Sequence, residues 1–107
     1  MSFEVKELGQ VIAVRNLVFV YDNDMSETTT VKVGLPYASD EPNAFICPYE
    51  ISSESHSKLF GMVGIDAIQA LDLTMKILKT ELDYWERKYS GKFRFLDEVG
   101  HGCENNG

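Results

Sequence analysis

The chain has 107 residues, of which 44% are apolar and 25% charged, a composition typical of one globular domain and not of a disordered chain. The 17 acidic residues outnumber the 10 basic ones, so the formal charge is −7. A surface of that sign repels phosphate backbones and anionic lipid head groups, so we expect neither nucleic acid nor a membrane as the partner.

Alternating apolar residues predict four strands before the helix. In the first strand, the face with Ile12, Val14, Val18 and Val20 is the more apolar one, broken only by Asn16. Polar or proline-containing turns separate the strands, and Pro48 inside the third predicts a bulge or an edge without a partner on the side away from the fourth. The predicted strands are residues 10–21, 28–35, 44–52 and 58–63.

A long amphipathic helix is predicted from about Ala67 to Tyr89. Asp66 is a good N-cap, Gln69 completes a capping-box pattern, and Gly91 is a natural C-cap. Apolar residues then recur at steps of three and four: Ile68, Leu71, Met75, Leu78, Leu82 and Trp85.

A short last strand follows at residues 92–96, with Phe93 and Phe95 on one face. The predicted fold class is therefore α+β, with a mostly antiparallel meander of four strands, one helix packed on one face and a final short strand. Residues 1–99 form the predicted single domain, and residues 100–107 a flexible C-terminal tail. The second sheet face must then be solvated, dimerised or covered by a partner.

No catalytic or metal site is predicted, and no cofactor. His56 lies in a serine-rich turn and His101 in the tail, and neither has an evident apolar pocket around it. Cys47 lies in a strand, where cysteines are usually inert, although a dyad of Cys47 with His56 remains an alternative. Asp22 and Asp24 lack the glycine and the glutamate that would complete a calcium loop. The two cysteines make no disulfide framework, and no apolar run reaches membrane-spanning length, so we expect a cytoplasmic protein.

Charge is unevenly distributed along the sequence. Between residues 21 and 54 there are seven acidic residues and one basic one, whereas residues 76–94 carry six basic and three acidic ones. In an up-and-down meander the first and third turns lie at the same end, so their carboxylates would form a docking surface for a basic protein. The alternative is that these turns are acidic only because they are solvated. The predicted partner-binding residues are Asp22, Asp24, Glu27 and Glu54, with Tyr21 beside them.

Two stretches carry a resemblance to known proteins. Phe45-Ile-Cys-Pro-Tyr-Glu-Ile51 and Gly64-Ile-Asp-Ala-Ile-Gln-Ala-Leu-Asp-Leu73 resemble an uncharacterised family of small bacterial α+β domains over residues 5 to 97. In size and charge the chain is also similar to immunity proteins of contact-dependent growth inhibition and other polymorphic toxin systems. That resemblance implies a small acidic protein of the cytoplasm that binds a toxin domain, often a basic nuclease.

These observations favour a stoichiometric immunity protein that is not an enzyme and that neutralises a basic bacterial toxin domain. The first alternative is a binding module that forms a homodimer through the sheet face. A small enzyme that uses Cys47 or His56 is the second alternative.

Overall fold

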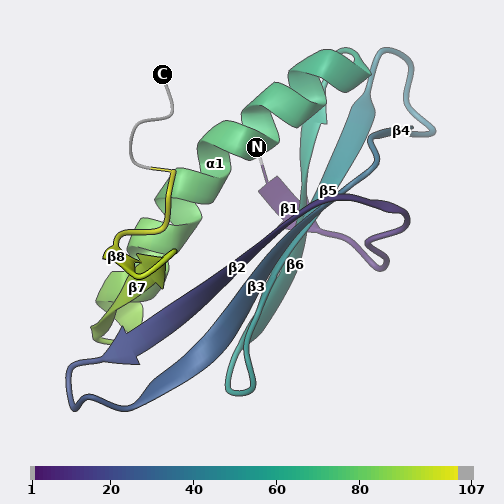
Figure 1. Ribbon diagram of the computed structural model, residues 1–107. Coiled ribbons are helices and arrows are strands. Elements are labelled where there is room, and N and C mark those ends of the chain that lie inside the picture. Colours follow the sequence, from purple (N-terminus) through teal and green to yellow (C-terminus); the bar gives the residue numbers. More distant parts are fainter. Residues whose placement is uncertain (1, 104–107) are drawn as a thin grey trace.

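The computed structural model describes residues 2–103, except for the side chains of Ser2 and Phe3. One helix lies across one side of a twisted antiparallel sheet (Figure 1). The predicted α+β class is therefore confirmed. The elements are β1 (Ser2–Glu4), β2 (Val11–Tyr21), β3 (Ser26–Gly34), β4 (Tyr37–Ala38), β5 (Phe45–Ser52), β6 (Ser57–Gly64), α1 (Ala67–Lys88), β7 (Gly91–Phe95) and β8 (Glu98–Val99).

The sheet contains more strands than the sequence predicts. Within residues 2–103 its strand order is β1-β6-β5-β3-β2-β7-β8, and the two-residue β4 pairs with β5 beside this path. The predicted four-strand meander is its centre, β6-β5-β3-β2, and the predicted last strand is β7, which pairs with β2. The missed strands β1, β4 and β8 have only two or three residues each, too few for an alternating pattern to be recognised.

Pro48 lies in a central strand and not at an edge of the sheet. It is opposite Gly61 of β6 in a continuous register. On the other side of β5 the ladder with β3 ends at the pair Val33 and Tyr49, and Tyr49 is the residue next to the proline. The side away from β6 is thus without a partner in the ladder at this position, where the N–H that proline lacks is not required.

The face of β2 that packs under the helix is the less apolar of the two. Leu17 and Phe19 on that face are fully buried. Val14 and Val18 on the opposite face are exposed, with 55% of the Val14 side chain accessible. The more apolar face of this strand therefore faces outward, and residues 5–8 of the N-terminal segment cover another part of the sheet on that side.

That segment, residues 5–8, crosses the outer face near β1. A Cβ added to Gly61 would lie 2.9 Å from Cγ1 of Val5, and one added to Gly34 would lie 2.3 Å from the carbonyl oxygen of Leu8. A Cβ at Gly34 would collide with the backbone of the segment and one at Gly61 would displace the Val5 side chain, because the segment lies directly on the strands. This covers only the end of the face near β1, while Val14 and Val18 stay exposed.

The helix begins where its capping residues predict. Asp66 accepts a hydrogen bond from the Gln69 backbone N–H at 2.8 Å, and the Gln69 side chain accepts one from the Ile65 N–H at 2.7 Å. Its C-cap is Tyr89 and not Gly91, because Ser90 takes the left-handed conformation and Gly91 already begins β7. Among residues 2–103 no helix has the apolar length needed to cross a membrane.

The buried stripe of α1 differs from the predicted one at its N-terminal half. A Cβ added to Gly64 of β6 would lie 2.4 Å from the Ala70 backbone nitrogen, so the helix touches the strand here without side chains between them. Only small residues fit under such a contact, and Ala70 and Thr74 are the buried ones. Ile68, which the sequence places on the apolar face, is 80% exposed. Further along, the buried residues are Leu78, Leu82 and Trp85.

This packing predicts different costs for two truncations in the same helix. Leu78→Ala removes a side chain that is 3% exposed and should lower the free energy of unfolding by about 2 to 5 kcal/mol. Ile68→Ala should cost less than about 0.5 kcal/mol, since that side chain stands in solvent. Urea unfolding followed by circular dichroism measures both, and similar losses for the two variants would contradict the helix orientation.

Candidate functional site

The predicted docking turns do lie at one end of the sheet. The Ser55 hydroxyl in the β5–β6 turn donates a hydrogen bond of 2.9 Å to Glu27, which follows the β2–β3 turn. The latter turn is tight, since the Asp24 N–H donates to the Tyr21 carbonyl and Asp24 itself has a φ of 70°. The structure therefore brings the first and third turns together. We call these two turns and their flanking residues, 21–27 and 52–57, the turn end.

Two of the five predicted residues are turned inward. Glu27 and Tyr21 are half-buried on the helix side of the sheet. The Ser53 hydroxyl lowers the pKa of Glu27 below its usual value, burial opposes the shift, and the Ser55 hydroxyl adds to it. Burial and the neighbouring Glu27 raise the pKa of Tyr21. The Glu27 carboxylate therefore joins the two turns by accepting the hydrogen bond from Ser55. Asp22, Asp24 and Glu54 are exposed.

The tertiary structure also mixes charges that are separate in the sequence. The Asp22 N–H donates to the Ser90 carbonyl at 2.9 Å, so the end of α1 lies beside the β2–β3 turn. Arg87 and Lys92 line a shallow depression together with Asp22, Asp83 and Glu86. The turn end is consequently acidic at its tips and of mixed charge where the helix ends.

An aromatic cluster lies under the same end of the helix. The His56 ring stacks on Tyr89 with 3.6 Å between ring centroids, and Trp85 meets both rings edge-on. His56 lies in the serine-rich turn as predicted, but it is half-buried against aromatic rings, so the expectation that it has no apolar pocket is wrong. The four-residue spacing of Trp85 and Tyr89 put them on one helix face, but no local signal pointed to His56 as their partner.

The C-terminal residues that the structure describes are docked and do not form a frayed tail. His101 is 1% exposed, and its Nε2 lies 2.8 Å from a carboxylate oxygen of Asp83 on α1. The Cys103 N–H donates to Nδ1 of the same ring at 3.2 Å. We assign the ring proton to Nε2 from these contacts. The prediction of a tail is corrected for residues 100–103, and residues 104–107 lie outside the described part.

Asp83 links this docked segment to the helix. Its second carboxylate oxygen lies 2.9 Å from the Lys79 ammonium. Burial raises the pKa of Asp83, but the hydrogen bonds from His101 and Lys79 outweigh burial and leave the pKa below its usual value. Because both nitrogens of His101 are engaged, this imidazole serves to anchor the C-terminal segment.

Arg15 of β2 holds the same segment from the other side. One of its guanidinium nitrogens donates to the His101 carbonyl at 3.3 Å and to Cys103 Sγ at 3.6 Å. The guanidinium also lies 4.3 Å from the centre of the Phe95 ring, a cation–π distance. No local sequence pattern indicates this contact, because 86 residues separate Arg15 from His101.

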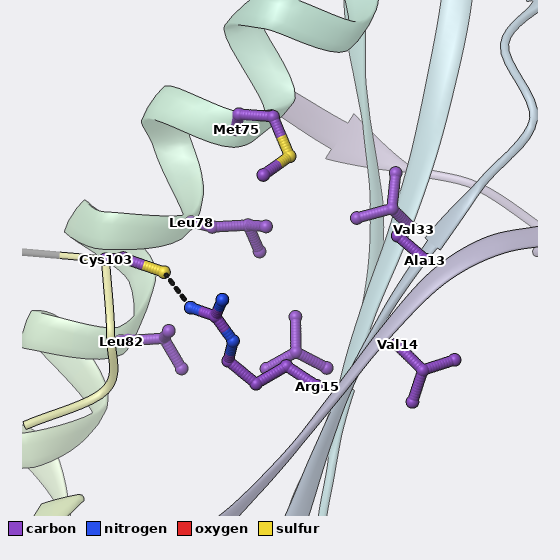
Figure 2. Close-up of a pocket in the computed structure, with 9 residues that line it drawn as sticks. Ala13, Val14, Arg15, Val33, Met75, Leu78, Leu82 and Cys103 are labelled. Carbon is purple, nitrogen blue, oxygen red and sulfur yellow. Dashed lines mark hydrogen bonds between the residues drawn. The ribbon is translucent and has the colours of Figure 1, made fainter. Parts of the chain in front are cut away.

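A small apolar cavity of about 100 Å³ lies between α1 and β2 (Figure 2). Figure 2 shows Arg15 and Cys103 on one side of it and Met75 and Val33 at the other. The cavity exists because α1 packs on β5, β6 and β7 and passes over β2 at a distance. Its walls are Ala13, Val14, Arg15, Val31, Val33, Met75, Leu78, Leu82 and Cys103.

The proposed dyad of Cys47 and His56 is not assembled. Cys47 is fully buried under the helix, where burial raises the pKa of its thiol. Roughly 16 Å of extended strand separates Cys47 from Ser52, where the turn that contains His56 begins. Within residues 2–103 no three His, Cys, Asp or Glu side chains gather as metal ligands would.

The architecture defines a small α+β domain whose sheet is covered by one helix and left partly open. Residues 13–104 match the family model described as Domain of unknown function (DUF6968), and the chain belongs to this family. The matched range includes the docked segment with His101 and Cys103. No curated protein and no solved structure matches the chain significantly.

The docking of residues 100–103 predicts a specific dependence on Asp83. Asp83→Ala leaves the buried His101 N–H without its acceptor and should cost about 1 to 3 kcal/mol of unfolding free energy near pH 7. The pKa of Asp83 is lower in the folded than in the unfolded chain. The stabilisation by the Asp83 carboxylate is therefore complete above its ordinary pKa and is lost as the pH falls through its folded-state pKa. The difference between wild type and variant should therefore shrink below about pH 4.

Asp72→Ala is the matched control, since it removes an exposed pair with Lys76 on the same helix. That change should cost no more than about 0.5 kcal/mol. Chemical unfolding at a series of pH values measures both variants. Equal losses, or a difference independent of pH, would show that the Asp83–His101 contact does not hold the segment.

Proposed function

We propose that this chain is a stoichiometric protein-binding domain that neutralises a basic bacterial partner, as an immunity protein neutralises its toxin. The observation that carries the proposal is the set of exposed carboxylates at the turn end, Asp22, Asp24 and Glu54, on a chain with a formal charge of −7. The Ser55–Glu27 hydrogen bond joins the two turns that present these carboxylates.

The turn end also carries an apolar contact point. Met25 at the tip of the β2–β3 turn is 65% exposed, and methionine adapts its shape readily to a partner surface. Carboxylates around an apolar side chain suit a surface that attracts a basic protein at a distance and then packs against it. Binding there would block the active site or the substrate groove of a toxin domain, for example a nuclease.

Positive charge at the turn end is confined to the helix side. Arg87 and Lys92 lie there among Asp22, Asp83 and Glu86, while Glu54 belongs to the other turn. A basic partner should therefore approach from the side of the turn tips and away from the end of α1. This division favours one orientation of the partner, because like charges disfavour the others.

The proposal predicts the association rate of charge variants with a basic partner identified by co-purification. Replacing the three exposed carboxylates in the variant Asp22→Asn, Asp24→Asn, Glu54→Gln should slow association by about tenfold or more at low salt. The difference should narrow as the ionic strength rises, because the Debye length falls from about 30 Å at 0.01 M to about 8 Å at 0.15 M. Stopped-flow mixing across a salt series measures these rates.

The matched control removes the same number of charges at the opposite end of the sheet. Glu7, Asp40 and Glu41 are exposed there, and the variant Glu7→Gln, Asp40→Asn, Glu41→Gln has the same net charge as the first. Its association rate should fall much less. Equal rates for the two variants would mean that only the total charge matters, and the turn end would then not be the docking surface.

A further inference from the structure

The edge of β2 beside the cavity is open for most of its length. On one side β2 pairs with β3 along the strand, in a register that is regular from Ala13 to Val20. On the other side it pairs with β7 only from Val18 to Tyr21. Within residues 2–103, no strand pairs with Ala13–Leu17 on that side. Such an edge is a template for one more strand.

The segment contains no proline or lysine, two residues that often protect a free strand edge. Its one charged side chain, Arg15, is turned inward onto Phe95 and the docked C-terminal residues. Val14 is exposed, and the bulge lies before the open segment, between Val11 and Ala13. Ala13, Val14 and Asn16 along this edge are exposed, whereas Leu17 at its end is buried.

The cavity lies beside this edge, on the helix side. Ala13 and Arg15 share that side of β2, and both line the cavity. Side chains of an added strand would alternate in the same way, so every second one would point toward α1. An apolar cavity of about 150 Å³ can take up benzene, so one of about 100 Å³ suits a single aliphatic side chain.

We propose that the groove between the β2 edge and α1 binds an extended segment of a partner protein, which adds as a strand beside Ala13–Asn16. One leucine-sized aliphatic side chain of that segment enters the cavity formed by Val33, Leu78 and Leu82. Backbone hydrogen bonds supply the attachment, and the cavity supplies the selectivity, as in other cases of strand addition. This surface is separate from the turn end and does not depend on the function proposed above.

Two other occupants fit the cavity less well. A second copy that paired through its own β2 edge would present Ala13 and Arg15 on the helix side, because Leu17 is already buried in its own core. A methyl group or a guanidinium does not fill an aliphatic cavity. Residues 104–107, Glu-Asn-Asn-Gly, contain no aliphatic side chain either. A partner segment with such a side chain matches both the edge and the cavity.

The test uses the full isotope-labelled chain and a synthetic probe, acetyl-Thr-Thr-Thr-Leu-Thr-Thr-Thr-amide. NMR titration should shift the backbone amides of Ala13–Asn16 together with the methyl groups of Val33, Leu78 and Leu82. The same peptide with serine in place of leucine should bind at least tenfold more weakly, because it cannot fill the cavity. No shifts with the leucine peptide, or equal binding of both peptides, would overturn the proposal.

Two variants on β2 locate the site. Ala13→Leu places an aliphatic side chain in the cavity from an exposed position and should weaken binding of the leucine peptide at least tenfold. Val18→Leu lies on the outer face of the paired part of the strand and should leave binding unchanged. If Ala13→Leu fails to fold, the two peptides on the wild-type chain decide alone. Shifts of the same amides on raising the protein concentration without peptide would show that a second copy occupies the edge and would overturn the proposal.

Discussion

The direct contact between α1 and the end of β6 determines most of the architecture. Gly64 has no side chain, so the Ala70 backbone lies against the strand at a distance that any Cβ would prevent. From this close contact the helix crosses the sheet diagonally, over β5 and β6 and then onto β7. The contact explains why Ala70 and Thr74 are buried while the larger Ile68 is not.

The diagonal path of the helix also explains the open parts of the molecule. Because α1 starts over β6 and β5 and ends at β7, beside the second half of β2, an apolar wedge remains between the helix and the first half of β2. Residues 100–103 fill one part of this wedge, held by Asp83 from the helix and by Arg15 from the strand. The cavity and the free β2 edge are the part that remains. The close contact at the start of α1 therefore leaves the edge of β2 open at a distance from that contact.

The turn end depends on a different kind of contact. Its two turns are joined by polar groups, with Glu27 accepting from Ser55, while the aromatic rings of His56, Trp85 and Tyr89 pack under the helix end. The ionised form of Glu27 is the favoured one, as its lowered pKa indicates. Of the carboxylates that charge counting singled out, one is therefore structural, and Asp22, Asp24 and Glu54 remain available to a partner.

By itself the sequence determined the features that depend on neighbouring residues. Asp66 and Gln69 mark the start of the helix, and alternating apolar residues mark the four long strands of the meander, because capping and strand periodicity act over a few positions. Only the tertiary structure decided which face of β2 is buried, that His101 docks on Asp83, and that Arg87 lies beside Asp22. These features join residues far apart in the chain. They follow from the path of the helix across the sheet, which a glycine at one strand end permits and no local pattern encodes.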